Sequence, residues 1–262
     1  MCLILFAHGV HPAWPLVVAA NRDEFHARPA APAGWWAERR GVLAGRDLEA
    51  GGTWLGLGAS GRFAAVTNFT EAPPEPVPPR SRGDLVADFL AGDVPPEVYL
   101  HAVASEGQAY RGFNLLVGNA RELWYFSNRA GAPVRLDPGI YGLSNHLLDT
   151  AWPKVRRGKS ALASFTEAEA RADVPALLEL LGDDTQPDDA ELAAAGLEPE
   201  AARRVAPCFI RGDVYGTRAS TVVLLAADRA RFSERRFGPG GRHEGDRHFE
   251  IDLGPQEALS RT

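Results

Sequence analysis

The first 24 residues restrict the fold more than any other stretch, because they predict a hairpin with a cysteine at one end. Residues 2–7 are an apolar run typical of a buried strand, and residues 14–20, rich in Val, Leu and Ala, are a second one. The intervening His8–Pro12 segment is typical of a turn, so the two runs predict a β-hairpin. Such a hairpin brings the polar residues 21–24, which follow the second strand, back beside Cys2.

Later apolar runs also occur in neighbouring pairs, and the helical patterns cluster in the middle of the chain. Further strands are predicted over residues 62–69, 112–118, 122–127, 140–146, 206–210, 222–226, 231–237 and 247–251. Helices are predicted over residues 83–90, 96–104, 152–165 and 173–181, with one short helix within 183–199. Residues 29–51 and the proline-rich segment 70–80 are predicted to be loops. This order predicts an α+β fold of antiparallel strand pairs rather than alternating βαβ units.

One glycine-rich segment matches a known motif without its required context. Residues 56–61 fit the dinucleotide-binding pattern G-x-G-x-x-G. That pattern needs a strand before it and a helix after it, whereas the residues that follow Gly61 predict a strand. Ala59–Gly61 is therefore predicted to be a hairpin turn, and no nucleotide cofactor is expected.

Composition sets the class of protein and the partners to expect. The 262 residues are 45% hydrophobic and carry a net charge of −6, which suits one domain over residues 1–262 and argues against a nucleic-acid partner. Two cysteines, Cys2 and Cys208, make neither a disulfide framework nor a zinc site, so no metal is expected. Without a basic leader or a long apolar run, the sequence predicts a cytoplasmic protein with a small-molecule partner and no membrane span. It does not indicate the oligomeric state.

Cys2 has a chemical role to consider because it directly follows the initiator methionine. Removal of Met1 would leave Cys2 with a free α-amine, whose pKa is about 8, beside a thiol with a pKa of about 8.5. The amine can then serve as the base for its own side chain, which is the logic of an N-terminal nucleophile. Two other interpretations stay open: a small buried hydrophobe, and a redox-sensing thiol for which Cys208 is the distant partner.

The run Asn21-Arg22-Asp23-Glu24 is the second candidate for chemistry. Four polar residues at the end of an apolar strand are costly to bury unless they are paired or functional. A solvated turn is the alternative interpretation of this run.

Five motifs in order along the chain together resemble one family. They are Cys2, Asn-Arg-Asp-Glu at 21–24, Gly-Gly-Thr-Trp-Leu-Gly at 51–56, Gly-Leu-Ser-Asn at 142–145 and Tyr-Gly-Thr-Arg at 215–218. The family is the NRDE family, also called the transport and Golgi organization family. It in turn resembles the N-terminal nucleophile hydrolases, and the resemblance implies a four-layer αββα sandwich of two antiparallel sheets.

The nearest branch of those hydrolases, which includes the bile-salt and penicillin V amidases, implies roles for particular residues. Cys2 matches the cysteine that attacks an amide after loss of methionine, and Asp23 matches the aspartate that positions its amine and thiol. Asn68 and Asn145 match the two asparagines of the site, and Arg218 matches the arginine before the last strong strand. The resemblance therefore implies acyl transfer through Cys2.

The sequence departs from the amidase pattern beside the aspartate. The amidases have an arginine three residues ahead of it, where this chain has Ala20, while Arg22 directly precedes Asp23. We include Arg22 among the predicted catalytic residues. Neighbouring polar and aromatic residues are predicted to bind substrate, namely Asn21, Thr53, Trp54 and His146.

The sequence therefore predicts an N-terminal cysteine hydrolase or acyltransferase that acts on an amide or thioester bond of a small molecule. The alternative is a binding or trafficking protein for haem or an acyl lipid on the same fold, because members of the family are linked to lipid or acyl-CoA handling and to haem trafficking. No haem-attachment motif is present, so the candidate haem ligands are single side chains: His8, His11, His146 or Cys2.

Overall fold

Two antiparallel sheets form the centre of the molecule. The computed structural model describes residues 2–71, 80–166 and 173–254. The first sheet has six strands in the order β10-β1-β2-β11-β12-β13. Their bounds are β1 Cys2–His8, β2 Leu16–Phe25, β10 Gly139–Leu143, β11 Tyr215–Leu225, β12 Arg229–Gly238 and β13 Arg242–Asp252.

The second sheet has seven strands in simple sequence order from β3 to β9. Their bounds are β3 Ala30–Trp35, β4 Val42–Asp47, β5 Leu55–Gly58, β6 Phe63–Asn68, β7 Phe113–Gly118, β8 Leu123–Ser127 and β9 Val134–Arg135. Each strand pairs antiparallel with the next, so this sheet is a meander of hairpins. The first sheet, by contrast, combines strands from both ends of the chain.

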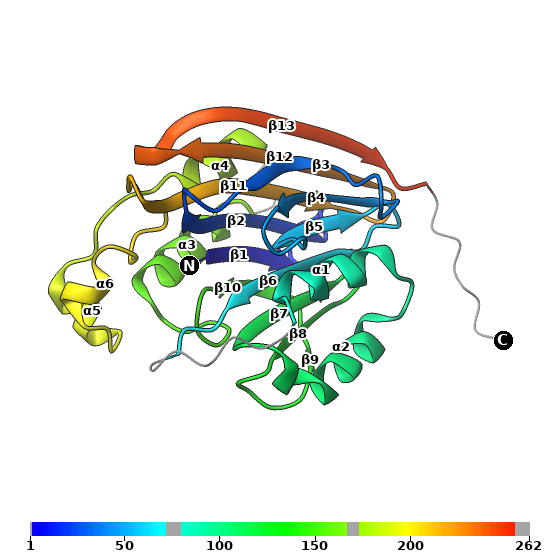
Figure 1. Cartoon of the computed structure of the whole chain (residues 1–262), viewed down its shortest axis with the longest axis horizontal. Helices are drawn as coiled ribbons and strands as arrows, with labels where there is room; N and C mark the ends of the chain where they lie inside the picture. The colour runs from blue at the N-terminus through cyan, green and yellow to red at the C-terminus, as the bar shows by residue number, and fades with distance from the viewer. Residues whose placement is uncertain (1, 72–79, 167–172, 255–262) are drawn as a thin grey trace.

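Helices cover the outer face of each sheet (Figure 1). Helices α1 (Arg82–Ala91) and α2 (Pro96–Ser105) pack on the second sheet, and α3 (Pro153–Ala163) and α4 (Val174–Leu181) pack on the first. The short helices α5 (Asp189–Ala194) and α6 (Pro199–Ala202) form a small cluster of their own. The 3₁₀ turns are η1 (Gly107–Ala109) and η2 (Pro239–Gly241). The layers are thus helices, sheet, sheet and helices, as the sequence resemblance implies.

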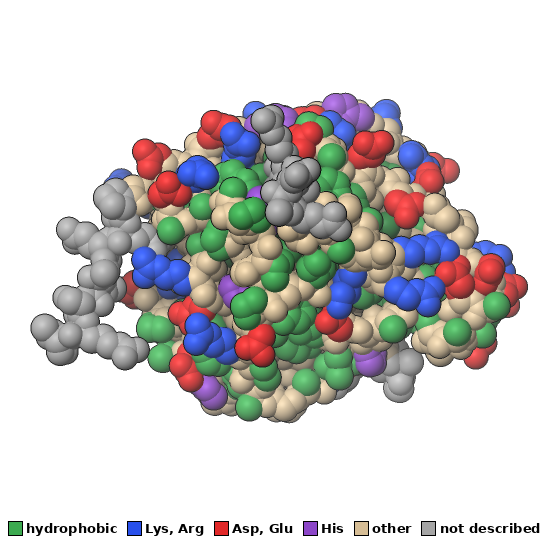
Figure 2. Space-filling model, turned by 180° about the vertical axis from the view of Figure 1, so that it is seen from behind, with side chains coloured by type: hydrophobic (Ala, Val, Ile, Leu, Met, Phe, Trp, Pro, Cys, Tyr) green, Lys and Arg blue, Asp and Glu red, His purple; other side chains and the backbone are tan. Residues whose placement is uncertain are grey.

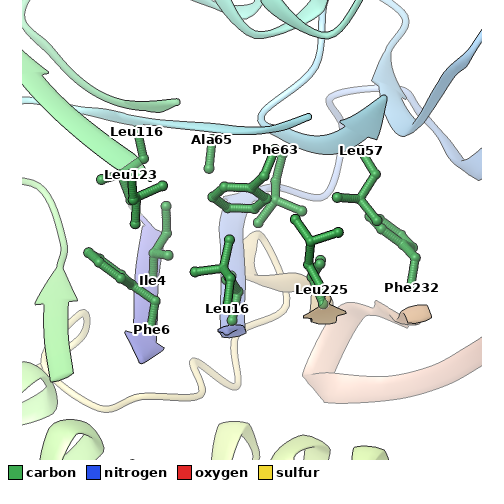
Figure 3. Close-up of a cluster of buried hydrophobic side chains, with 14 of the residues drawn as sticks. Ile4, Phe6, Leu16, Leu57, Phe63, Ala65, Leu116, Leu123, Leu225 and Phe232 are labelled. Atoms are coloured by element: carbon green, nitrogen blue, oxygen red, sulfur yellow. The ribbon is translucent and has the colours of Figure 1, made fainter. Parts of the chain in front are cut away.

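The core between the sheets follows from the two-residue period of the strands. Alternate residues of β1, such as Ile4 and Phe6, face the second sheet, where side chains such as Leu123 lie over them (Figure 3). The residues between them, Leu3 and Leu5, face α3 and α4. Both faces of β1 are therefore apolar, which is why its sequence is a continuous hydrophobic run.

The structure confirms the opening hairpin and corrects two of the predicted boundaries. The second strand does not end before the polar run: β2 continues through Phe25, because β11 pairs with it along that whole length. Residues 29–51 are not a loop, since they contain β3 and β4. The glycines and prolines of this segment interrupt the alternating pattern by which a strand is predicted.

One predicted strand is absent from the structure, and one predicted loop falls mostly outside the described residues. Residues 206–210 are buried but do not form the predicted strand. Most of the predicted proline-rich loop, residues 72–79, lies outside the described residues. Among the helices that are described, none has the length and apolar character needed to span a membrane.

Candidate active site

The pairing of the first two strands determines which residues accompany Cys2. Cys2 lies directly opposite Arg22, and Leu3 lies opposite Asn21. Because neighbouring residues of a strand point to opposite faces, Cys2 and Arg22 share the face toward the second sheet, while Asn21 points toward α3 and α4. The polar run of β2 is thus divided between two environments.

A cleft of about 490 Å³ opens at this end of the two sheets. Its walls come from the start of β1, the end of β2, the segment between β4 and β5, the end of β6 and the start of α1. The lining residues include Cys2, Arg22, Asp23, Thr53, Trp54 and Asn68. Six of the ten predicted site residues therefore meet in one cavity, although they are scattered over 67 positions of the sequence from Cys2 to Asn68.

Hydrogen bonds hold the backbone of Cys2 on both sides. Its nitrogen donates to Asn145 Oδ1 at 2.9 Å, and its carbonyl accepts from the Ser144 hydroxyl at 2.7 Å. Asn145 Nδ2 donates in turn to the carbonyl of Asn68 at 2.8 Å. Asn145 is 1% exposed and does not line the cleft, so its amide fixes the nitrogen of Cys2 from behind. This is a positioning geometry, and Asn68 is the asparagine that faces the cavity.

The thiol of Cys2 lies among groups of both charges. Burial raises the pKa of the Cys2 thiol, and a hydrogen bond from the Asp23 backbone N–H opposes that shift. Asp23 is 2% exposed, and its Oδ1 accepts from the Thr217 hydroxyl at 2.7 Å. Burial also raises the pKa of Asp23, against the opposing charge of Lys154. A buried carboxylate next to a thiol is a costly arrangement, of the kind found at reactive sites.

Arg22 is packed between an aromatic ring and two carboxylates. Its guanidinium carbon lies 4.3 Å from the centre of the Trp54 ring, and Nη2 lies 3.4 Å from Asp47 Oδ2 and 3.9 Å from Glu24 Oε2. Trp54 is held there because it lies against Gly45, where an added Cβ would be 2.5 Å from the ring. Nη1 of Arg22 is buried without a hydrogen-bond partner among the described residues, and Arg22 lines the cleft.

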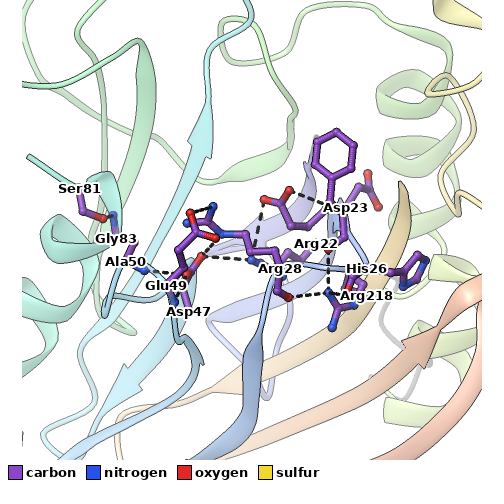
Figure 4. Close-up of polar contacts among 12 residues, drawn as sticks. Arg22, Asp23, His26, Arg28, Asp47, Glu49, Ala50, Ser81, Gly83 and Arg218 are labelled. Atoms are coloured by element: carbon purple, nitrogen blue, oxygen red, sulfur yellow. Dashed lines mark hydrogen bonds and ion pairs between the residues drawn. The ribbon is translucent and has the colours of Figure 1, made fainter. Parts of the chain in front are cut away.

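The segment between β4 and β5 forms one wall of the cleft and packs against α1. Arg28 binds Asp47 at 2.6 Å and Glu49 at 3.0 Å (Figure 4). The Thr53 backbone N–H donates to the carbonyl of Gly83 at 3.2 Å. A Cβ on Gly52 would lie 2.4 Å from the backbone of Gly83, so only glycine allows this approach. The Gly-Gly-Thr-Trp motif therefore builds the wall.

The structure places four of the predicted site residues outside the cleft lining. Besides Asn145, they are Asn21, His146 and Arg218. Asn21 bonds to the carbonyls of Leu181 and Cys208, each at 2.9 Å, on the far face of the sheet.

Arg218 and His146 have structural partners instead. The guanidinium of Arg218 donates to the carbonyls of Phe25, His26 and Arg28, and these hydrogen bonds stabilise the turn after β2 (Figure 4). The ring of His146 contacts the Thr150 hydroxyl at 2.9 Å and packs near Phe69.

Several lining residues had not been predicted from the sequence. They are mainly charged: Glu24, Arg28, Asp47, Glu49, Arg80, Arg82 and Arg111. Glu24 belongs to the recognised Asn-Arg-Asp-Glu run and was available to prediction. The others lie outside the five motifs, and only the folded chain brings them to the cavity.

The candidate haem and metal ligands do not gather around the cleft. His8 is at the other end of β1, roughly 20 Å from Cys2 for a strand of this length. His11 Nδ1 accepts from the backbone N–H groups of Ala13 and Trp14, which is a turn-stabilising role. Within the described residues, no group of three or more His, Cys, Asp or Glu side chains is arranged to hold a metal ion.

Known structures share this architecture and define its class. Penicillin V acylase from Agrobacterium tumefaciens aligns with a TM-score of 0.54 at 12% identity, over 98% of this chain and 89% of that one. The N-acylethanolamine-hydrolyzing acid amidase orthologue of Caenorhabditis elegans aligns with a TM-score of 0.51 at 11% identity, over 85% and 92% of the two chains. The C2A mutant of conjugated bile acid hydrolase from Clostridium perfringens gives 0.51 at 9%, over 96% and 92%. The fold is therefore that of the N-terminal nucleophile hydrolases.

Sequence relatives define the family more narrowly. The family model for "Transport and Golgi organisation 2" matches residues 1–239. The Transport and Golgi organization protein 2 homologues of Bos taurus and Homo sapiens are 41% and 36% identical, each over 90% of this chain and 92% of the relative. The Drosophila melanogaster protein is 30% identical over 87% of this chain and 89% of its own length. The chain belongs to the Transport and Golgi organisation 2 family.

Proposed function

We propose that this protein is an N-terminal cysteine hydrolase or acyltransferase that cleaves an amide or thioester bond of a small molecule. The observation that carries the proposal is the placement of Cys2: its nitrogen is fixed 2.9 Å from Asn145 Oδ1 while Cys2 itself lines the cleft. The resemblance in fold to three amide-cleaving enzymes supports the same reaction class. Family membership alone does not specify a reaction.

The proposed reaction begins with removal of Met1, which converts the nitrogen of Cys2 into a free α-amine. The amine takes the thiol proton, and the sulfur forms a bond to the substrate carbonyl carbon. The tetrahedral intermediate then expels the amine or thiol of the substrate, which leaves with the proton held by the α-amine. Water or a second nucleophile attacks the resulting thioester, delivers its proton to the α-amine and then to sulfur, and so regenerates Cys2.

Particular residues support these steps. The side-chain amide of Asn68, at the cleft surface, is the donor we assign to the developing oxyanion, a contact worth about 100- to 1000-fold in rate in other enzymes. Asn145 is a positioning residue, because it orients the nitrogen that acts as base. Asp23 holds the sulfur through its backbone N–H and places a negative charge near the protonated amine.

The test measures N-terminal processing, the reactivity of Cys2 and turnover in the same protein. Intact mass shows whether Met1 is removed, and peptide mapping after one equivalent of iodoacetamide compares labelling at the two cysteines. We expect a processed chain in which Cys2 is labelled faster than Cys208, whose thiol pKa is raised to about 12 by burial. A library of amides and thioesters is then screened with the wild type, Cys2→Ala and the control Cys208→Ala.

We expect Cys2→Ala to abolish turnover and Cys208→Ala to retain it, because Cys208 lies on the opposite face of the sheet. Thermal unfolding of both variants shows that each is folded. A retained Met1, or undiminished turnover in Cys2→Ala, would rule the mechanism out. Turnover absent from the wild type, with a Soret shift on haem titration, would instead support the binding protein.

A further inference from the structure

The two walls of the cleft differ in how their charges are compensated. On the wall formed by β2 and the β4–β5 segment, the carboxylates are matched by arginines. Arg28 lies 2.6 Å from Asp47 and 3.0 Å from Glu49, and Arg22 lies between Asp47 and Glu24. With three carboxylates and two arginines, this wall has no excess of positive charge that would attract an anion.

The adjoining part of the lining, at the start of α1, has an arginine without such a partner. Nη1 of Arg82 donates to the carbonyl of Gly112 at 3.1 Å, and Arg82 makes no ion pair with any described residue. The carboxylates whose charge reaches Arg82 already have arginine partners: Glu24 lies 3.9 Å from Arg22, and Glu71 pairs with Arg129. A guanidinium has five N–H donors, so most of those on Arg82 are available to a ligand.

A second arginine lines the same part of the cleft. Arg111 borders the cleft together with Arg82, and burial, followed by the charge of Arg111, lowers the pKa of Arg82. Elsewhere on the surface, arginines lie beside carboxylates, as Arg235 does with Asp246 at 2.9 Å and Arg211 with Asp184 at 2.6 Å. Figure 2 shows the same mixing of blue and red side chains over the rear face. Arg82, which makes no ion pair with a described residue, differs from these two arginines and lies in the cavity of Cys2.

The arginine pair is also close enough to Cys2 to affect it. The negative charge of a Cys2 thiolate is among the charges that act on Arg82, and both residues line one cavity. Ser81 and Gly83, at the N-terminus of α1, lie on the same wall and add the positive end of the helix dipole. An anion on this wall would therefore lie beside the reacting sulfur.

We propose that Arg82, assisted by Arg111, binds an oxyanion of the substrate, a carboxylate or a phosphate, and so places an anionic acyl compound with its carbonyl at Cys2. This inference names the substrate class of the proposed active site and rests on that function. The planar guanidinium is suited to both groups because it can bind two oxygens at once. Neutral amides and thioesters of the same size would lack this contact.

The charge of the alkylating reagent provides a test that requires no turnover. Iodoacetate and iodoacetamide both transfer their carbon to the Cys2 thiolate with loss of iodide, but only iodoacetate carries a carboxylate. The ratio of their rates at Cys2 cancels any change in the thiolate fraction. We expect Arg82→Gln to lower the ratio of the iodoacetate rate to the iodoacetamide rate about tenfold. Arg82→Lys, which keeps the charge without the planar fork, should give an intermediate ratio.

The control and the competing anions complete the design. Arg121→Gln removes one positive charge in the turn between β7 and β8, at the end of that hairpin opposite Arg111, and should leave the ratio unchanged.

Protection of Cys2 from iodoacetamide by inorganic phosphate identifies a phosphate site, and protection by acetate identifies a carboxylate site. If Arg82→Gln does not fold, Arg111→Gln supplies the same comparison.

The outcomes separate this proposal from the proposed function. An unchanged rate ratio in a folded Arg82→Gln protein overturns the anion site, even if the enzyme turns over neutral amides. A lowered ratio supports the site even if no substrate in the library is cleaved.

Discussion

Asn21 and Arg22 are neighbours in sequence, yet they serve two different regions of the molecule. Arg22 lies on the face of the first sheet that borders the cleft, stacked on Trp54 opposite Cys2. Asn21 lies on the other face, where its amide donates to the carbonyls of Leu181 and Cys208 and its Oδ1 accepts from the Ser220 hydroxyl at 2.6 Å. One four-residue motif therefore contributes to two polar regions at once.

The two regions differ in how completely their polar groups are satisfied. On the helix side, Asn21 connects β2 to β11, to the last residue of α4 and to the segment before β11, and each of its polar atoms has a partner. On the cleft side, Nη1 of Arg22 is buried without a hydrogen-bond partner among the described residues, and Arg82 has no ion pair there. The difference indicates that the helix-side face stabilises the fold, whereas the cleft-side face is arranged for a ligand.

The largest expected effect is a loss of stability on the helix-side face. Asn21→Ala leaves two buried carbonyls and the Ser220 hydroxyl without their partners, so we expect the free energy of unfolding to fall by about 3 kcal/mol. Turnover per folded molecule should be unchanged, because Asn21 does not line the cleft. Urea unfolding and an active-site titration measure the two quantities. A stable variant with lost turnover would contradict the division between the faces.

The second largest expected effect is a loss of turnover on replacing Asn145, the asparagine that holds the nitrogen of Cys2. Asn145→Ala releases the nitrogen of Cys2, and a misplacement of the reacting groups by about 1 Å can cost about 100-fold in rate. We therefore expect kcat to fall about 100-fold, with a smaller change in KM because Asn145 does not line the cleft. Asn145→Asp, which keeps the acceptor at Oδ1, should recover part of the rate. Equal losses in the Ala and Asp variants would argue against a positioning role.

Local sequence signals were sufficient to predict the elements that have a regular hydrophobic pattern or a clear turn. The hairpin of residues 2–7 and 14–20, the turn at Ala59–Gly61 and the helices near 83 and 96 could be predicted because each has a clear period or a clear turn signal. β3 and β4 could not, since Pro32, Gly34 and Gly45 interrupt their pattern and only cross-strand pairing reveals them.

The candidate site was predictable in two steps. The position of Cys2 after Met1 and the predicted hairpin indicated Cys2 and the run that contains Asp23, and the family resemblance added Asn68; the structure brings these three residues to one cleft. Neither step supplied Arg82 and Arg111, because they come from the start of α1 and the segment before β7, and their proximity depends on the packing of the whole second sheet. Nor could the sequence show that Arg218 clamps backbone carbonyls, because that role depends on where the turn after β2 lies.

The smallest expected effect is a gain in stability on removing a charge at the cleft. Burial raises the pKa of Asp23 above its value in the unfolded chain, which is about 3.9. The folded state then binds a proton more tightly than the unfolded state, so this group favours folding at low pH and that contribution is lost as pH rises through the folded-state pKa. Asp23→Asn should therefore raise the free energy of unfolding at pH 8, where the wild-type carboxyl is ionised in the unfolded chain.

The pH series distinguishes this electrostatic effect from a change in packing. The gain of Asp23→Asn over wild type should disappear below about pH 4, where the carboxyl is protonated in both states. Glu234, whose pKa is also raised by burial, is present in both proteins and cancels from the difference. A variant that is less stable than wild type at pH 8 would mean that Lys154 and Thr217 stabilise the charged carboxylate. The expected gain, accompanied by slower turnover, would show that the protein retains the buried charge of Asp23 at the expense of stability.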